Sequence, residues 1–150
     1  MLETAVGVVT IIAVGIAAYG LFYNVKATKQ QANTQLFLDY TARYERIMES
    51  FPAEALSARL DLDGELPPES PELSRSILRY LNMSSEELYL HERGYLDSDI
   101  WTIWERELNR TLQSPLLRRE WASLRPEFES YPKFRDYVDR IQRPTNLRAA

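Results

Sequence analysis

Glu87 and His91 are the residues whose types and spacing best suit chemistry in this chain. His91 is the only histidine among 150 residues, and Glu87 precedes it by four positions in the stretch EELYLHERG. In a helix this spacing places both side chains on one face, as in a two-ligand metal site. Acidic residues that follow could complete such a site or support acid–base catalysis; they are Asp97, Asp99 and Glu105.

A structural role for His91 is the interpretation that we prefer. His91 lies three residues before Gly94, which has the character of a left-handed helix C-cap. Near a helix C-terminus the macrodipole favours positive charge, and the ring can bind the last carbonyl groups. We therefore assign no catalytic residue, no metal site and no cofactor. Glu87 and His91 remain the functional candidates.

Other catalytic signatures are missing from the sequence. The chain has no cysteine, which excludes disulfides, thiolate metal sites and cysteine nucleophiles. Neither a Gly-x-Ser-x-Gly elbow nor a glycine-rich phosphate loop occurs among the five glycines. We expect a protein that acts without catalysis, and an enzyme that uses His91 and nearby carboxylates is an alternative.

The sequence predicts an all-α fold to position these residues. It has no sustained two-residue alternation of apolar side chains and no Asn-Gly hairpin. Serine–proline pairs at Ser70–Pro71 and Ser114–Pro115 have the pattern of an N-cap followed by the first helical residue. After a long N-terminal helix, the expected helices are 53–60, 71–93, one that Asp97 or Ser98 caps and that runs to 112, then 115–125 and 130–142. The stretch LDLDGELPPESP between the first two of these is expected to be a loop.

An apolar run occupies residues 5–23, AVGVVTIIAVGIAAYGLFY, and contains no charged residue. As a helix it would be about 28 Å long, close to the hydrocarbon thickness of a bilayer. We expect a retained transmembrane helix. A cleaved secretory signal and a buried core helix are alternatives, but the first normally follows basic residues and the second rarely stays apolar on every face.

Charged flanks predict the orientation of this span. Lys26 and Lys29 follow it, and only the chain's amino group is basic before it. The positive-inside rule therefore places residues 1–4 outside the cytoplasm and the chain after the span inside it. Residues 24–51 contain neither glycine nor proline, which predicts a helical stalk. Residues 52–142 then form a small cytoplasmic helical domain, and residues 143–150 a flexible tail.

Two faces of the long helix are predicted to make contacts. Small residues at spacings of three and four form a membrane-span packing face for self-association: Thr10, Ala13, Ala17 and Gly20. Bulky apolar residues form a stalk docking face for the chain's own helical domain: Phe37, Tyr40, Tyr44, Ile47 and Phe51. The spacing between the two sets places them on different sides of one helix.

The charge distribution suggests partners. Net charge is −4, but acidic residues dominate positions 54–107 and basic residues dominate positions 108–148. These segments could contact each other, or the basic one could contact anionic lipid head groups. Acidic residues interspersed with the basic ones, and the lack of a recognised motif, argue against nucleic-acid binding. The expected partners are membrane lipid and either further copies of the chain or a larger membrane complex.

Three stretches resemble uncharacterised bacterial membrane proteins that have one N-terminal span and a small helical cytoplasmic domain. They are LFLDYTARYERIM, LRYLNMSSEELYLHERGYLDSDIWTIWERELNRTL and the tryptophan-bearing helix that follows. The resemblance implies a single-span inner-membrane protein and no particular reaction. We therefore expect a non-enzymatic, membrane-anchored protein that assembles with itself or with a larger membrane complex.

A narrower comparison is with the small membrane accessory protein of certain RNA-targeting CRISPR systems, which assembles a membrane pore. That protein is associated with an arginine a few positions before a histidine. This sequence departs from the pattern, because Arg79 precedes His91 by twelve positions. A membrane effector or pore-forming subunit, for example in bacterial defence, is kept as an alternative by analogy.

Overall fold

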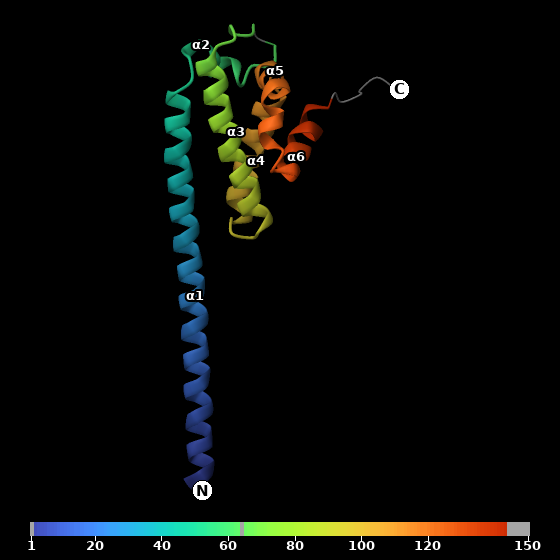
Figure 1. The fold of residues 1–150 in the computed structure, drawn as a ribbon. Coiled ribbons are helices and arrows are strands. Elements are labelled where there is room, and N and C mark those ends of the chain that lie inside the picture. The colour runs from blue at the N-terminus through green and yellow to red at the C-terminus, as the bar shows by residue number, and fades with distance from the viewer. Residues whose placement is uncertain (1, 64, 144–150) are drawn as a thin grey trace, which may run out of the picture. The chain divides into compact units, whose positions relative to one another are not determined.

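The computed structural model of the chain describes residues 2–63 and 65–143, with side chains from residue 19 onward. This part of the chain forms six α-helices and one short 3-10 helix, and contains no strand, which confirms the all-α prediction. The elements, shown in Figure 1, are α1 (Leu2–Glu49), α2 (Ala53–Ala58), α3 (Pro71–Glu92), α4 (Ser98–Gln113), α5 (Pro115–Leu124), η1 (Arg125–Phe128) and α6 (Pro132–Gln142).

Helix α1 covers both the predicted span and most of the predicted stalk. It ends at Glu49, where the chain turns toward Pro52 and the amides of Ser50 and Phe51 bond carbonyls three residues back. Among the residues with described side chains, no helix is both long and apolar enough to cross a bilayer. The side chains of residues 5–18 lie outside that set, including those of the predicted packing face at Thr10, Ala13 and Ala17. Residues 144–150 of the predicted tail also lie outside it.

The chain divides into two compact units, residues 1–39 and 40–150. We call the second unit the helical domain. It includes residues 40–49 of the predicted stalk, where the last three turns of α1 pack against later helices. Tyr40 lies 5.4 Å from Trp104 and Tyr44 lies 6.5 Å from Tyr80, measured between ring centroids.

Local signals fix both ends of α3. The Ser70 hydroxyl accepts a hydrogen bond of 3.1 Å from the Leu73 amide, and Pro71 occupies the first turn. At the other end Gly94 has φ of 71°, as predicted for a left-handed C-cap. The amides of Gly94 and Tyr95 bond the carbonyls of His91 and Leu90, which makes a Schellman motif. This turn redirects the chain from α3 into α4.

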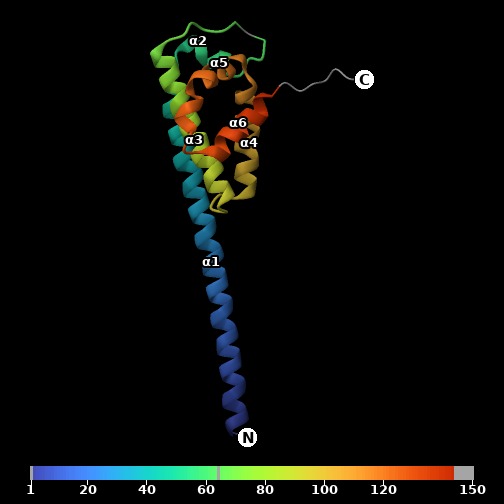
Figure 2. The ribbon, with the colours of Figure 1, turned by 45° about the vertical axis from the view of Figure 1, so that its right-hand side comes forward.

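The later helices follow the predicted order, with a shift at the last one. Asp97 caps α4 and Ser114 caps α5 through side-chain bonds to backbone amides. Helix α6 begins at Pro132 rather than at residue 130, because Glu129 and Tyr131 donate their amides to Pro126 and Phe128 and extend the turn after η1. Figures 1 and 2 show α3, α4 and α5 lying against one another, with α6 beside α4.

The core lies where the apolar faces of α3 to α6 meet. Fully buried side chains from these helices include Ile77, Leu81, Leu112, Leu117 and Val138. An aromatic cluster closes one end, with the rings of Phe128 and Phe134 centred 5.2 Å apart and both packed on Trp121. This framework holds the helices that line the candidate site.

Candidate functional site

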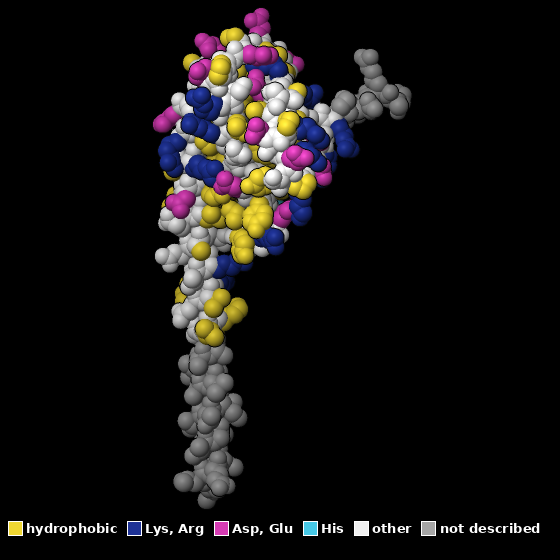
Figure 3. Space-filling model, viewed as in Figure 1, with side chains coloured by type: hydrophobic (Ala, Val, Ile, Leu, Met, Phe, Trp, Pro, Cys, Tyr) yellow, Lys and Arg dark blue, Asp and Glu magenta, His cyan; other side chains and the backbone are white. Residues whose placement is uncertain are grey.

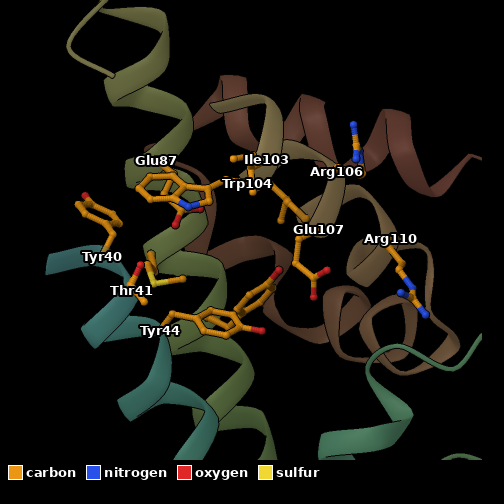
Figure 4. Close-up of a pocket in the computed structure, with 12 residues that line it drawn as sticks. Tyr40, Thr41, Tyr44, Glu87, Ile103, Trp104, Arg106, Glu107 and Arg110 are labelled. Carbon is orange, nitrogen blue, oxygen red and sulfur yellow. The ribbon is translucent and has the colours of Figure 1, made fainter. Parts of the chain in front are cut away.

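A pocket with a volume of about 560 Å³ lies among α1, α3 and α4 of the helical domain (Figure 4). Its size is within the roughly 300–1,000 Å³ typical of small-molecule sites. Residues from α1 and α3 form much of the wall: Tyr40, Thr41, Tyr44, Tyr80, Met83 and Glu87. Helix α4 supplies the remainder: Ile103, Trp104, Arg106, Glu107, Leu108 and Arg110. Aromatic and aliphatic groups dominate, as in most ligand sites.

Glu87 is the buried carboxyl group of this pocket. It is only 6% exposed, and within the described residues it makes no hydrogen bond or ion pair. Burial raises the pKa of Glu87 to about 8; the charge of Arg43 opposes the shift and that of Glu86 adds to it. The pocket therefore holds a carboxyl group that is mostly protonated at neutral pH.

Glu86, the next residue back, is in the opposite situation. Both of its carboxylate oxygens accept hydrogen bonds from the Arg43 guanidinium, one of them 3.0 Å long. The Tyr40 hydroxyl also donates to Glu86, at 3.3 Å. Burial, together with the charge of Glu86, raises the pKa of Tyr40 to about 12. Arg43 therefore bonds Glu86 and leaves Glu87 without a bonded cation.

Two further charges near the pocket are matched to each other. Arg59 bonds Glu107 at 3.4 Å, and its guanidinium carbon lies 5.8 Å from the centroid of the Tyr44 ring. Burial raises the pKa of both Tyr44 and Tyr80, so both phenols stay neutral at physiological pH. The pocket wall thus offers neutral aromatic rings around Glu87.

The pocket opens to solvent along α4. Ile103 is 62% exposed, and Arg106 and Arg110 are also exposed. In Figure 4 the two arginine side chains extend away from Glu87. Water therefore screens their charges more than it screens the charge of a group inside the pocket.

His91 lies in a different hollow from Glu87. Its ring stacks on Trp101, with centroids 4.6 Å apart and planes 10° apart. The hollow beside it measures about 750 Å³ and has charged walls from α3, α4 and α6. No group of three potential metal ligands occurs among the described residues. The helical spacing that suggested a joint site places Glu87 and His91 one turn apart, each against different neighbours.

The predicted docking face is divided among several environments. Ile47 and Phe51 are buried, and the half-buried Tyr40 and Tyr44 line the pocket. Phe37 is half-buried in the N-terminal unit. Two pocket residues on α3, Tyr80 and Met83, are not among the predicted site residues, although their positions seven and four residues before Glu87 place them on its face.

Fold and pocket together define a helical domain with a tyrosine-lined pocket and, among the described residues, a buried carboxyl group at Glu87 that no other group bonds. Comparison of the chain with protein-family models, with curated proteins and with solved structures found no match.

Proposed function

We propose that the chain is a single-pass membrane protein whose helical domain binds a ligand in the cytoplasm without catalysing a reaction. The observation that carries the anchoring is an apolar helix surface without a protein cover. Five large apolar side chains within seven positions are each at least 60% exposed: Tyr19, Leu21, Phe22, Tyr23 and Val25. Figure 3 shows apolar side chains on this stretch of α1.

Lipid is the solvent that suits this surface. At 100° per residue the five side chains point to more than one side of the helix, so a single partner groove would leave some of them in water. They continue the charge-free run that begins at residue 5, and Lys26 and Lys29 follow directly. This order of apolar run, aromatic residues and basic residues supports a cytoplasmic location for the helical domain, at the inner membrane.

The pocket supports binding rather than catalysis. Among the described residues, Glu87 has no acid or base within hydrogen-bond contact that could work with it. The other polar groups of the wall are phenols with raised pKa values, the Thr41 hydroxyl, arginines, and Glu107, whose carboxylate is bonded to Arg59. General acid–base catalysis needs groups whose pKa values suit two complementary roles, whereas a buried carboxyl among aromatic rings suits recognition of a ligand.

Self-association through the span is the second part of the proposal. Thr10, Ala13, Ala17 and Gly20 are spaced to share one helix face, and small residues allow close backbone approach in lipid. Gly20 is the member whose surroundings are described, and no heavy atom lies within 4 Å of the position that a Cβ would take there. Other membrane proteins could pack against the same face of small residues in a larger assembly.

Membrane anchoring is tested by charge insertion. Val9→Arg with Val14→Arg should move the protein from the carbonate-resistant membrane fraction into the soluble fraction, because each arginine costs about 3 kcal/mol at the centre of a span. Leu62→Arg with Leu66→Arg is the matched control, since both leucines are exposed in the loop before α3. Equal extraction of the two double variants would contradict the anchor.

Orientation can be measured cleanly because the chain has no cysteine. A membrane-impermeant maleimide should label Thr4→Cys in cells with a permeabilised outer membrane. It should label Tyr131→Cys, an exposed position of the helical domain, only after the inner membrane is broken. The reverse pattern would place the domain on the other side.

Assembly is tested by particle mass in detergent. Ala17→Leu with Gly20→Leu should reduce the mass of the solubilised particle. Ala18→Leu makes the same chemical change on a neighbouring side of the helix and should not. If the wild-type particle already holds one chain, self-association is wrong.

A further inference from the structure

The surroundings of Glu87 are chemically incomplete. The side chain lies in the pocket and is 6% exposed, and no described residue bonds it. A buried carboxylate without a partner is costly, so such a group either keeps a proton or receives a positive charge from elsewhere. A ligand is the remaining source of that charge.

We propose that this pocket binds a small alkylated ammonium ion, with Glu87 as its counter-ion and the rings of Tyr40, Tyr44 and Trp104 around its alkyl groups. The proposal rests on the binding role proposed above and names the class of ligand. Figure 4 shows Glu87 and these three rings arranged around the pocket. They come from α1, α3 and α4, so folding is needed to assemble the site.

An alkylated ammonium ion matches what the wall offers better than other cations. Aromatic rings attract such ions through their quadrupoles, and the attraction grows when water is excluded. A fully alkylated ammonium needs no hydrogen-bond acceptors, whereas a guanidinium or primary ammonium needs several. Glu87 and the surrounding rings supply charge and π-surface, and the wall's other carboxylate, Glu107, is already bonded to Arg59.

The charges around Glu87 leave room for an added cation. Arg43 bonds Glu86 on the α1 side, and Arg59 bonds Glu107 near Tyr44. Each of these arginines is therefore bonded to another carboxylate, and neither bonds the carboxyl group of Glu87. One negative charge is left to balance once Glu87 ionises.

The residues at the mouth of the pocket bear on whether the alkylated ammonium ion is a free compound or part of a lipid head group. Arg106 and Arg110 are exposed at the α4 edge, where they disfavour a second positive charge and could bind an anionic group. A free ammonium compound would use the pocket alone. A lipid head group with an alkylated ammonium and a phosphate would use the pocket and the arginines together.

Binding should be coupled to loss of a proton. Burial raises the pKa of Glu87 to about 8, and the neighbouring Tyr40 ionises only near pH 12. The charges opposite Glu87 belong to Arg43 and Glu86 on one side and to the α4 edge on the other. Affinity for the cation should therefore increase with pH up to about pH 8 and then level off.

The experiment is a calorimetric titration of the full chain in maltoside micelles with choline and with its uncharged carbon analogue. We expect choline to bind and the analogue to bind at least about tenfold more weakly, because only choline satisfies the Glu87 charge. Choline should also bind at least about tenfold more weakly at pH 6 than at pH 9. Equal affinity for the two compounds, or no choline binding, would overturn the proposal.

Substitutions make the test specific to the pocket. Glu87→Gln keeps the shape and should weaken choline binding at least about tenfold. Glu92→Gln, on the same helix but bonded to Lys133, should leave it unchanged. Trp104→Leu should weaken it severalfold, and circular dichroism confirms that each variant is folded. Choline affinity unchanged by Glu87→Gln would overturn the proposal. If the carbon analogue binds as well as choline, the proposal that the ligand is a cation is wrong, but the proposal that the pocket binds a ligand still holds.

The source of the ligand is distinguished by glycerophosphocholine, a soluble lipid head group. If glycerophosphocholine binds more tightly than choline, and this difference is lost in the double variant Arg106→Gln with Arg110→Gln, the ligand is a lipid head group. If choline binds more tightly, the ligand is a free cation. Both outcomes uphold the alkylated ammonium, and both leave the membrane anchor to be judged by its own extraction experiment.

Discussion

Two buried glutamates lie in different regions of the helical domain and differ in their hydrogen bonding. Glu120 on α5 is 3% exposed and bonded on both oxygens: Ser74 donates at 2.8 Å, and Arg119 donates twice, at 2.9 and 3.1 Å. Glu87 on α3 is similarly buried at 6% but has no bonded partner among the described residues.

The difference separates a structural carboxylate from one that is available for a ligand. Arg119 also donates at 2.7 Å to the carbonyl of Pro67, so the Glu120 cluster fastens the loop before α3 onto α5. Its charges are satisfied within the fold. The Glu87 carboxyl borders an open pocket and its charge is not satisfied, which is the usual condition of a binding or catalytic group rather than a structural one.

The largest expected effect lies in the Glu120 region. Glu120→Gln should destabilise the protein by about 3 kcal/mol, because it leaves the partly buried guanidinium of Arg119 with only the exposed Glu69 carboxylate, 4.0 Å away, as a charge partner. Glu127→Gln, an exposed change nearby, should stay within about 0.5 kcal/mol. Chemical denaturation measures both. Equal effects would mean that the Glu120 pair contributes nothing, and the comparison would fail.

The carboxyl group of Glu87 should make the folding stability of the protein depend on pH. The folded-state pKa of about 8 exceeds the reference value of 4.5, so the folded state binds more protons between these pH values. Stability should therefore fall as pH rises, by about 2 kcal/mol between pH 6 and pH 8. Glu87→Gln should flatten this dependence and raise the melting temperature at pH 8. A wild-type protein whose stability is flat in this window would contradict the unpaired carboxyl.

A change in the turn between α3 and α4 should affect stability without affecting either carboxylate. Gly94→Ala should cost about 1 kcal/mol, since its φ of 71° strains residues that have a Cβ. No heavy atom lies within 4 Å of the added Cβ, so the cost comes from the backbone alone. The denaturation midpoint should fall while the slope of stability against pH stays the same. A changed slope would mean that the turn positions Glu87.

The smallest effect is expected at the half-exposed pair beside the pocket. Glu86→Gln should cost about 0.5 kcal/mol, because solvent screens its pairing with Arg43. It should also lower the pKa of Glu87, since the charge of Glu86 contributes to raising that pKa. A titration followed by carbon-13 NMR of labelled glutamate would measure the pKa of Glu87 in the wild-type protein and in the variant. An unchanged or higher Glu87 pKa would contradict the assignment.

Local rules account for most of what the sequence predicted correctly. The caps at Ser70 and Ser114 and the left-handed Gly94 depend on neighbouring residues only, and the structure contains all three. Of the two residues that the sequence offered as the cap of α4, Asp97 and Ser98, the structure has Asp97. The start of α6 was predicted two residues early, because the competing hydrogen bonds of the preceding turn are not a pattern in the sequence.

By itself, then, the sequence determined the helical class, the order of the helices and most of their ends, and it marked Glu87 as a residue of interest. It paired Glu87 with His91 because both lie on one helix face. Tertiary structure decided their different surroundings: Trp101 stacks on His91, whereas Tyr44, Tyr80 and Trp104 surround the pocket that contains Glu87. The physical reason is that desolvation depends on which distant helices cover a side chain, and helical periodicity carries no information about them.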